Sequence, residues 1–178
     1  MLCGYRGALK SARLRVTAEP RAPGPIADTI GALKRLPDLR AAIEGLLLFL
    51  MVVAAGAWAA DSGVLQLKPL SSGQLMTTWL SAFLIPTMSE EIIFRGWVRK
   101  GAPIAAVCSL LAYLLWHPVQ TWFGLPFGRP EFTDPRFLGL IAWLGLACTL
   151  ARLRSNSIWP GVVIHWGVVV MWKSLYGG

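Results

Sequence analysis

Residues 101–128 read GAPIAAVCSLLAYLLWHPVQTWFGLPFG, a run of 28 residues without one Asp, Glu, Lys or Arg. A helix crosses the hydrocarbon core of a bilayer with about 20 predominantly apolar residues. This run is therefore long enough to span a membrane. One run of this kind also occurs in buried helices of soluble proteins, so the remainder of the chain has to decide between the two environments.

Four further apolar runs occur on either side of this stretch. They are 41–60, interrupted only by Glu44, and the uncharged runs 69–89, 137–151 and 155–172. A soluble core helix can imitate one such run but hardly five in series. The sequence therefore predicts an all-α fold, a polytopic membrane helix bundle of about five transmembrane helices.

The composition agrees with a membrane protein. Of 178 residues, 55% are hydrophobic and only 15% are charged, and the mean hydropathy is +0.56. Soluble domains carry roughly 25% charged residues. These values exclude a disordered chain and disfavour a soluble globule. The three cysteines (Cys3, Cys108 and Cys148) lack the spacing of a metal site or a disulfide framework.

The basic residues show a topological bias. Placing alternate loops on alternate sides of the membrane puts 13 Lys and Arg on the side of the N-terminus and four on the other. The positive-inside rule then predicts a cytoplasmic N-terminus and a C-terminus on the opposite side. We divide the chain into a basic, partly flexible arm (1–40) and a transmembrane domain (41–178). The net charge of +8 reflects this topology, so we expect the lipid bilayer and no nucleic acid as a partner.

Ionisable side chains inside the apolar runs mark a candidate site. The second run leads into Ser89-Glu90-Glu91-Ile-Ile-Phe-Arg95, and the only two histidines, His117 and His165, lie in the third and fifth runs. Ionisable groups within a membrane are costly and usually face the interior of the bundle. A lone membrane histidine most often serves as an interhelical hydrogen-bonding group. Two histidines together with a carboxylate pair favour a functional site.

Helical geometry separates the two glutamates. At about 100° per residue, Glu91 lies about 40° from Arg95 around the axis, whereas Glu90 lies about 140° from it. Glu91 is therefore expected to pair with Arg95, and Glu90 is left to face elsewhere. Pro86 should kink this helix, and Pro118 should perturb the third span in a similar way.

Depth along the helices predicts an interruption between the second and third spans. Measured from the shared membrane surface, His117 would lie roughly 10 Å deeper than Glu90 if both helices were straight and continuous. We therefore predict a broken or interfacial stretch between Gly96 and Ile104. With that break, Glu90 and His117 should approach within one bridging water, and His165 should face the same cavity.

Three motifs in this order resemble the CPBP family, which comprises the CaaX proteases and bacteriocin-processing enzymes and is also called the abortive-infection family. The motifs are Glu90-Glu91-x-x-x-Arg95, the aromatic-x-x-x-His of Tyr113 to His117, and His165 within Ser157-Ile-Trp-Pro-Gly-Val-Val-Ile-His165. The resemblance covers about residues 75–175. The first forty residues and the first span lie outside it.

The resemblance implies an intramembrane endopeptidase that cleaves a membrane-associated peptide or protein. On the family pattern, Glu90 and His117 activate a water and His165 stabilises the oxyanion, which makes these three the candidate catalytic residues. Glu91, Arg95 and Tyr113 would support them. This chemistry suits a carboxylate base with an imidazole partner beside an oxyanion donor in a dry cavity.

Two positions depart from the family pattern. Tyr113 stands where the family usually has Phe, and Val169 stands where the third motif, His-x-x-x-Asn, has its Asn. Loss of an oxyanion donor costs about 10²–10³ in turnover in proteases with a comparable arrangement. A catalytically silent membrane scaffold that binds a partner is therefore the alternative to a protease. A proton-coupled carrier using the same groups is disfavoured, because the chain has no internal repeat.

A metal site is the second alternative that the residues leave open. Glu90, His117 and His165 would be the ligands of a zinc ion, as in a metalloendopeptidase. The local spacing typical of such enzymes, His-Glu-x-x-His on one helix, is missing. We therefore expect a glutamate-type mechanism without a metal or other cofactor.

Overall fold

The computed structural model describes residues 24–177. The predicted arm before residue 24 lies outside this range. Within it the chain is helical and has no strand, which confirms the all-α prediction. The elements are α1 (Pro25–Lys34), α2 (Leu39–Asp61), α3 (Ser72–Ala82), η1 (Phe83–Met88), η2 (Glu91–Arg95), α4 (Pro103–Trp122), η3 (Pro130–Thr133), α5 (Pro135–Ser155) and α6 (Trp159–Tyr176).

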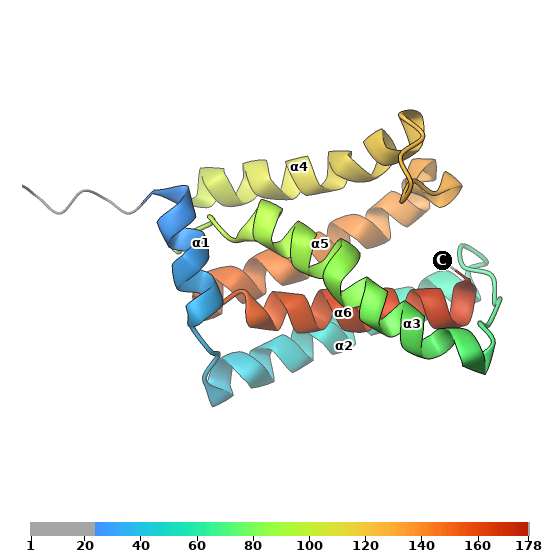
Figure 1. Ribbon diagram of the computed structural model, residues 1–178, viewed down its shortest axis with the longest axis horizontal. Helices are drawn as coiled ribbons and strands as arrows, with labels where there is room; N and C mark the ends of the chain where they lie inside the picture. The colour runs from blue at the N-terminus through green and yellow to red at the C-terminus, as the bar shows by residue number, and fades with distance from the viewer. Residues whose placement is uncertain (1–23, 178) are drawn as a thin grey trace, which may run out of the picture.

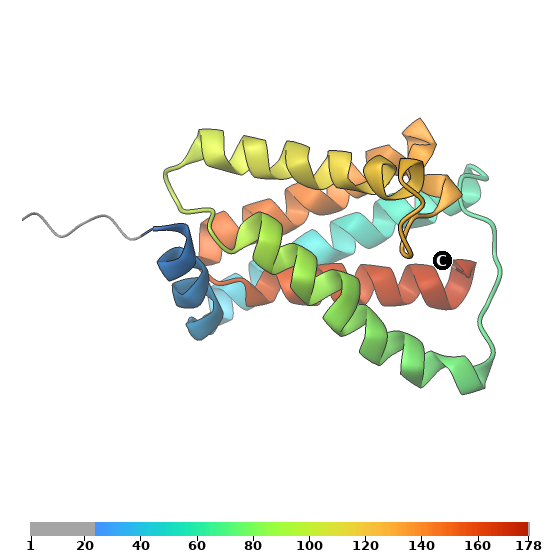
Figure 2. The ribbon, with the colours of Figure 1, turned by 45° about the horizontal axis from the view of Figure 1, so that its top comes forward.

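Five long segments form the bundle and correspond to the five apolar runs. They are α2, the α3–η1–η2 segment, α4, α5 and α6, and they alternate in direction (Figures 1 and 2). The helices α2, α4 and α5 are each long and apolar enough to cross a membrane. Helix α6 packs against α2, α3 and α5, so it occupies a central position.

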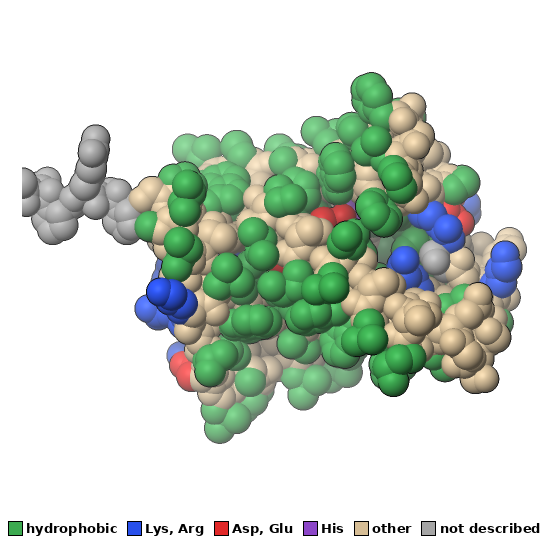
Figure 3. Space-filling view, viewed as in Figure 1, with side chains coloured by type: hydrophobic (Ala, Val, Ile, Leu, Met, Phe, Trp, Pro, Cys, Tyr) green, Lys and Arg blue, Asp and Glu red, His purple; other side chains and the backbone are tan. Residues whose placement is uncertain are grey.

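The surface of the bundle is apolar along its length. Large hydrophobic side chains such as Leu47, Met51, Leu111 and Val163 are more than half exposed. Figure 3 shows hydrophobic side chains spread over the long side of the molecule, with Lys and Arg gathered towards its two ends. Polar groups, in contrast, are buried in the interior, where Glu91 and Arg95 are fully enclosed. This distribution is the one expected when lipid replaces water around the middle of a protein.

The second span is interrupted, as Pro86 predicts. Ile85 leaves the helical region with φ −135° and ψ 118°. Beyond the kink, the turn from Glu91 to Arg95 is wide and of π type, with the Gly96 amide donating to the Glu91 carbonyl at 3.0 Å. Such turns are frequent at functional sites. In the third span, α4 continues through Pro118 without a break.

The predicted interruption between Gly96 and Ile104 is confirmed. No α-helix covers residues 96–102, and α4 begins at Pro103. Gly96 permits the tight end of this segment, because a Cβ there would lie 2.6 Å from the Ile92 carbonyl oxygen and 2.7 Å from the Thr29 methyl group. Any larger residue would clash with the Ile92 carbonyl and with the Thr29 side chain of α1.

Arg152 of α5 holds the end of the glutamate-bearing segment. Its guanidinium is buried and donates to the carbonyl oxygens of Arg95 at 3.2 Å and Gly96 at 3.3 Å. The last carbonyls of a helix lack partners within the helix, and a cation is favourable at that end. Arg152 therefore fixes the depth of η2 relative to α5.

The short helix α1 docks across one end of the bundle (Figure 1). Ser157 donates to the Arg35 carbonyl at 2.5 Å, and the Trp159 indole donates to the Leu33 carbonyl at 2.9 Å. Ala32 is buried against Ile158. Part of the predicted arm, residues 25–38, is thus an ordered part of the fold.

Candidate active site

Glu91 lies at the centre of a buried polar cluster formed with Arg95 and His165. Its Oε1 accepts a hydrogen bond from Arg95 Nη1 at 3.2 Å and lies 2.9 Å from His165 Nδ1. All three side chains are at most 2% exposed. The predicted pairing of Glu91 with Arg95 is confirmed. The contact with His165, on a helix 74 residues further along the chain, is a finding of the structure.

Two further contacts hold the guanidinium of Arg95. It donates to the Gly145 carbonyl at 3.4 Å, and its Cζ lies 3.8 Å from the centre of the Tyr113 ring. The second distance is that of a cation–π interaction. Tyr113 is therefore placed as a support for the polar cluster.

Glu90 stands apart from the pair, as helical geometry predicts. Its Oε2 lies 3.8 Å from His165 Nε2, beyond hydrogen-bonding distance, and has no hydrogen-bond partner among the described residues. The residue is only 6% exposed. Burying a carboxylate oxygen without a hydrogen-bond partner is costly.

His117 is oriented by its own helix. Its Nδ1 lies 2.9 Å from the Tyr113 carbonyl oxygen. A carbonyl oxygen can only accept, so Nδ1 carries the proton and Nε2 of the neutral ring is left as the basic nitrogen. The imidazole is held between the Tyr113 ring at 4.8 Å and the Phe132 ring at 5.0 Å, centre to centre.

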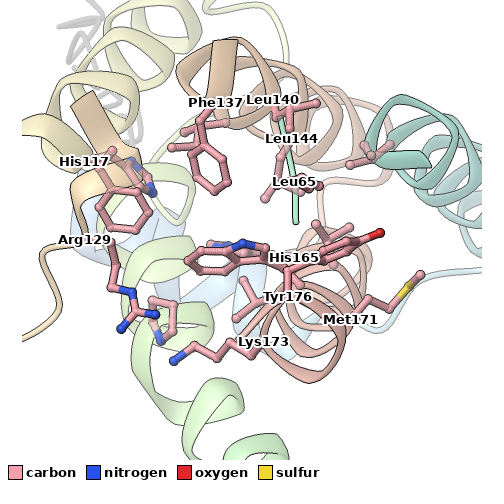
Figure 4. Close-up of a pocket in the computed structure, with 18 of the residues that line it drawn as sticks. Leu65, His117, Arg129, Phe137, Leu140, Leu144, His165, Met171, Lys173 and Tyr176 are labelled. Carbon is pink, nitrogen blue, oxygen red and sulfur yellow. The ribbon is translucent and has the colours of Figure 1, made fainter. Parts of the chain in front are cut away.

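One cavity of about 290 Å³ joins these groups. Glu90, His117 and His165 all line it, so the prediction that they face a common cavity is confirmed. Figure 4 shows His117 and His165 on its walls, with Phe137, Leu140 and Leu144 among the apolar residues around them. Whether Glu90 and His117 share a single water stays a prediction.

The comparison with known families agrees with this arrangement. A family model described as type II CAAX prenyl endopeptidase Rce1-like matches residues 72–171. The chain belongs to this family. It is therefore an integral membrane protein of a protease family, as three membrane-length helices also indicate. No curated protein and no solved structure matches the chain significantly.

The matched range contains the three predicted motifs and leaves α1 and α2 outside. Helix α2 nevertheless contributes Val52, Val53, Gly56 and Ala57 to the cavity wall. The family portion of this Rce1-like protein therefore depends on the preceding span to close its cavity.

Gly161 lets α6 approach the buried polar cluster. A Cβ at this position would lie 2.9 Å from Glu91 Oε2, closer than carbon and oxygen atoms normally come. The Cys148 thiol lies 3.5 Å from the Gly161 carbonyl and marks the same close approach between α5 and α6. The small residue is needed so that His165, one turn further on, reaches Glu91.

Most residues of the cavity wall were not anticipated from the sequence. Among them are Gln120, Arg129, Phe132 and Lys173. Gln120 follows His117 by three residues, and this helical spacing could have placed it on the same face. The other three are brought to the cavity by the loop after α4 and by the end of α6, which no local pattern predicts.

The spacing of possible metal ligands can be compared with the zinc alternative. Within residues 24–177 no three His, Cys, Asp or Glu side chains gather closely enough to hold a metal ion. His165 Nδ1 is engaged by Glu91, and His117 Nδ1 by a carbonyl. Each imidazole thus has one nitrogen left for the cavity.

Proposed function

We propose that this protein is a glutamate-type intramembrane endopeptidase that cleaves a membrane-associated peptide or protein. Glu90 and His117 activate the attacking water, and His165 stabilises the oxyanion. Family membership supports a CAAX-type intramembrane endopeptidase in general. The observation that carries the assignment of residues is the common cavity lined by the Glu90 carboxylate, whose Oε2 has no hydrogen-bond partner, and by two oriented imidazoles.

The chemistry follows from the state of each group. Glu90 accepts a proton from the water while the basic Nε2 of His117 holds the second hydrogen, and the oxygen attacks the carbonyl carbon. Collapse of the tetrahedral intermediate then breaks the C–N bond. The proton held by Glu90 passes to the departing amine, so atoms and charges balance.

His165 is suited to the oxyanion because of Glu91. In this proposal the Glu91 carboxylate holds the imidazole at Nδ1, and Nε2 on the cavity side donates a hydrogen bond to the developing negative charge. Arg95 in turn holds the Glu91 carboxylate in place. Glu91 and Arg95 are therefore positioning residues in this proposal.

The test is cleavage by the purified protein in liposomes. A panel of membrane-anchored and prenylated peptides, each with a fluorophore and a quencher, is compared for the wild type, Glu90→Gln and Glu44→Gln. Glu44 is a matched control, since it pairs with Arg154 on the outside of the bundle. We expect cleavage that is lost in Glu90→Gln and retained in Glu44→Gln. Cleavage that survives in Glu90→Gln would refute the assignment.

The silent scaffold is the second candidate, and Val169 favours it. This residue lines the cavity and is 7% exposed, but its side chain offers no hydrogen-bond donor. Of the two positions of the third motif, only His165 would then supply an oxyanion donor. Absence of Glu90-dependent cleavage across the whole panel, in a folded protein that still binds one of the peptides, would establish the scaffold.

A further inference from the structure

Helix α1 contacts the chain directly after the segment that carries the two glutamates. Its Asp28 Oδ2 lies 3.2 Å from Arg99 Nε. Thr29, the next residue, packs directly on Gly96, since a Cβ added there would lie 2.7 Å from the Thr29 methyl group. The proposed mechanism does not use α1, which also lies outside the residues 72–171 that the family model matches.

The same short helix binds the start of α6. The Ile158 amide donates to the Ala32 carbonyl at 3.2 Å, and the Trp159 indole donates to the Leu33 carbonyl at 2.9 Å. His165 follows Ile158 by seven residues, about 10.5 Å along the helix. A displacement of α1 at this contact would therefore displace the imidazole as well.

One hydrophobic cluster packs these elements together. Its buried members are Ala32, Ile158 and Val162, and Met88 and Ile92 pack against them. The last two flank the pair of glutamates in the sequence, so the cluster lies next to the residues of the proposed site. A close-packed interior transmits strain, because it has no free volume to absorb a shift.

We infer that α1 is a clamp that sets the depth of the glutamate-bearing segment relative to α6, with Asp28 and Ala32 as positioning residues. The inference rests on the proposed function. Figure 1 shows α1 across the end of the bundle where α6 begins. The contact that the clamp controls joins Glu91 Oε1 to His165 Nδ1 at 2.9 Å. None of residues 25–34 lines the cavity, so α1 acts without touching the substrate.

The experiment enlarges the buried Ala32 and compares it with the same substitution on the exposed side of α1. Ala32→Leu in liposomes should lower kcat for peptide cleavage by about 10- to 100-fold, the cost of displacing catalytic groups by about 1 Å. KM should change by less than about twofold, because substrate contacts are kept. The control Ala27→Leu, at an exposed position, should retain both constants. Adding Ile158→Ala to Ala32→Leu returns space to the cluster and should recover part of kcat.

A charge exchange tests the other contact of the clamp and leaves the buried cluster intact. Asp28→Arg places a second cation next to Arg99 and should lower kcat by up to about fivefold, the range of a partly exposed ion pair. Arg99→Asp in the same chain restores opposite charges and should restore kcat. A purely local role of Asp28 in holding α1 would leave kcat unchanged in the single variant.

Hydrogen exchange provides a readout that needs no catalysis. In Ala32→Leu the amides of residues 91–99 and 159–165 should both exchange about 10-fold faster or more, the range for an overpacked site, and in Ala27→Leu neither should change. Faster exchange confined to α1, or an unchanged kcat in both Ala32→Leu and Asp28→Arg, would overturn the clamp while the proposed function stands. Faster exchange of both segments, in a protein whose wild type cleaves no peptide, would support the clamp and overturn the proposed function.

Discussion

Glu91→Gln should destabilise the protein far more than the same substitution at Glu90. Glu91 contacts both Arg95 and His165, and removing its charge leaves a guanidinium that is 0% exposed without a counter-ion. Breaking a buried pair by removing one partner costs about 3–5 kcal/mol. Arg95 keeps the Gly145 carbonyl and the Tyr113 ring, so we expect the lower end, about 3 kcal/mol.

The expected shift is large enough to measure directly. For a chain of this length, 1 kcal/mol changes Tm by about 2–4 °C, so the loss of Glu91 corresponds to roughly 6–12 °C. Glu90→Gln should leave Tm unchanged or raise it, because a neutral amide is cheaper to bury than an unpaired carboxylate. Tryptophan fluorescence of the detergent-solubilised protein would follow unfolding, with Glu44→Gln as a control whose shift should be smaller than that of Glu91→Gln.

A double variant tests the physical cause. If the cost of Glu91→Gln comes from the orphaned guanidinium, Arg95→Met in the same chain should recover part of the lost Tm. Equal falls in Tm for Glu90→Gln and Glu91→Gln would refute the separation of roles. A double variant less stable than Glu91→Gln would show that charge burial is not the reason.

Three further outcomes are expected. Gly161→Ala should lower the free energy of unfolding by about 1–3 kcal/mol, because the added Cβ would overlap Glu91 Oε2 in the buried polar cluster. Gly139→Ala, with open space around its Cβ, is the control in the same thermal assay. Arg152→Met should lower both Tm and the rate of peptide cleavage, because the carbonyls at the end of η2 lose their guanidinium donor. The control is Arg154→Met, at a residue on the outside of the bundle, which should reduce cleavage far less. Chelators should leave cleavage unchanged, and elemental analysis of the active protein should find no stoichiometric zinc; one zinc per chain, lost together with activity, would contradict the glutamate-type mechanism.

The sequence by itself determined the spans and the spacing of the ionisable residues within them. Apolar runs of membrane length have few structural solutions, because lipid leaves no partner for unpaired backbone groups. The all-α fold and the separation of Glu90 from the Glu91–Arg95 pair therefore followed from local spacing. The mismatch in depth along straight helices also predicted the interruption after Gly96, which the structure confirms.

Other features were decided by tertiary structure alone. Helical spacing gave Glu91 one partner, Arg95, and could not supply His165, which comes from a helix 74 residues away. The docking of α1 depends on hydrogen bonds to Ser157 and Trp159, since its own sequence has no pattern that specifies a site on the bundle.

The part of the cavity that Arg129 and Lys173 line shows the same division. Arg129 and Lys173 are 44 positions apart and belong to a loop and a helix end, where neither hydrophobic periodicity nor spacing fixes a position. They become neighbours only because α4 and α6 finish at the same end of the bundle (Figures 1 and 4). Periodicity describes one helix at a time, whereas a site between helices depends on which faces meet, and close packing around residues such as Gly161 decides that.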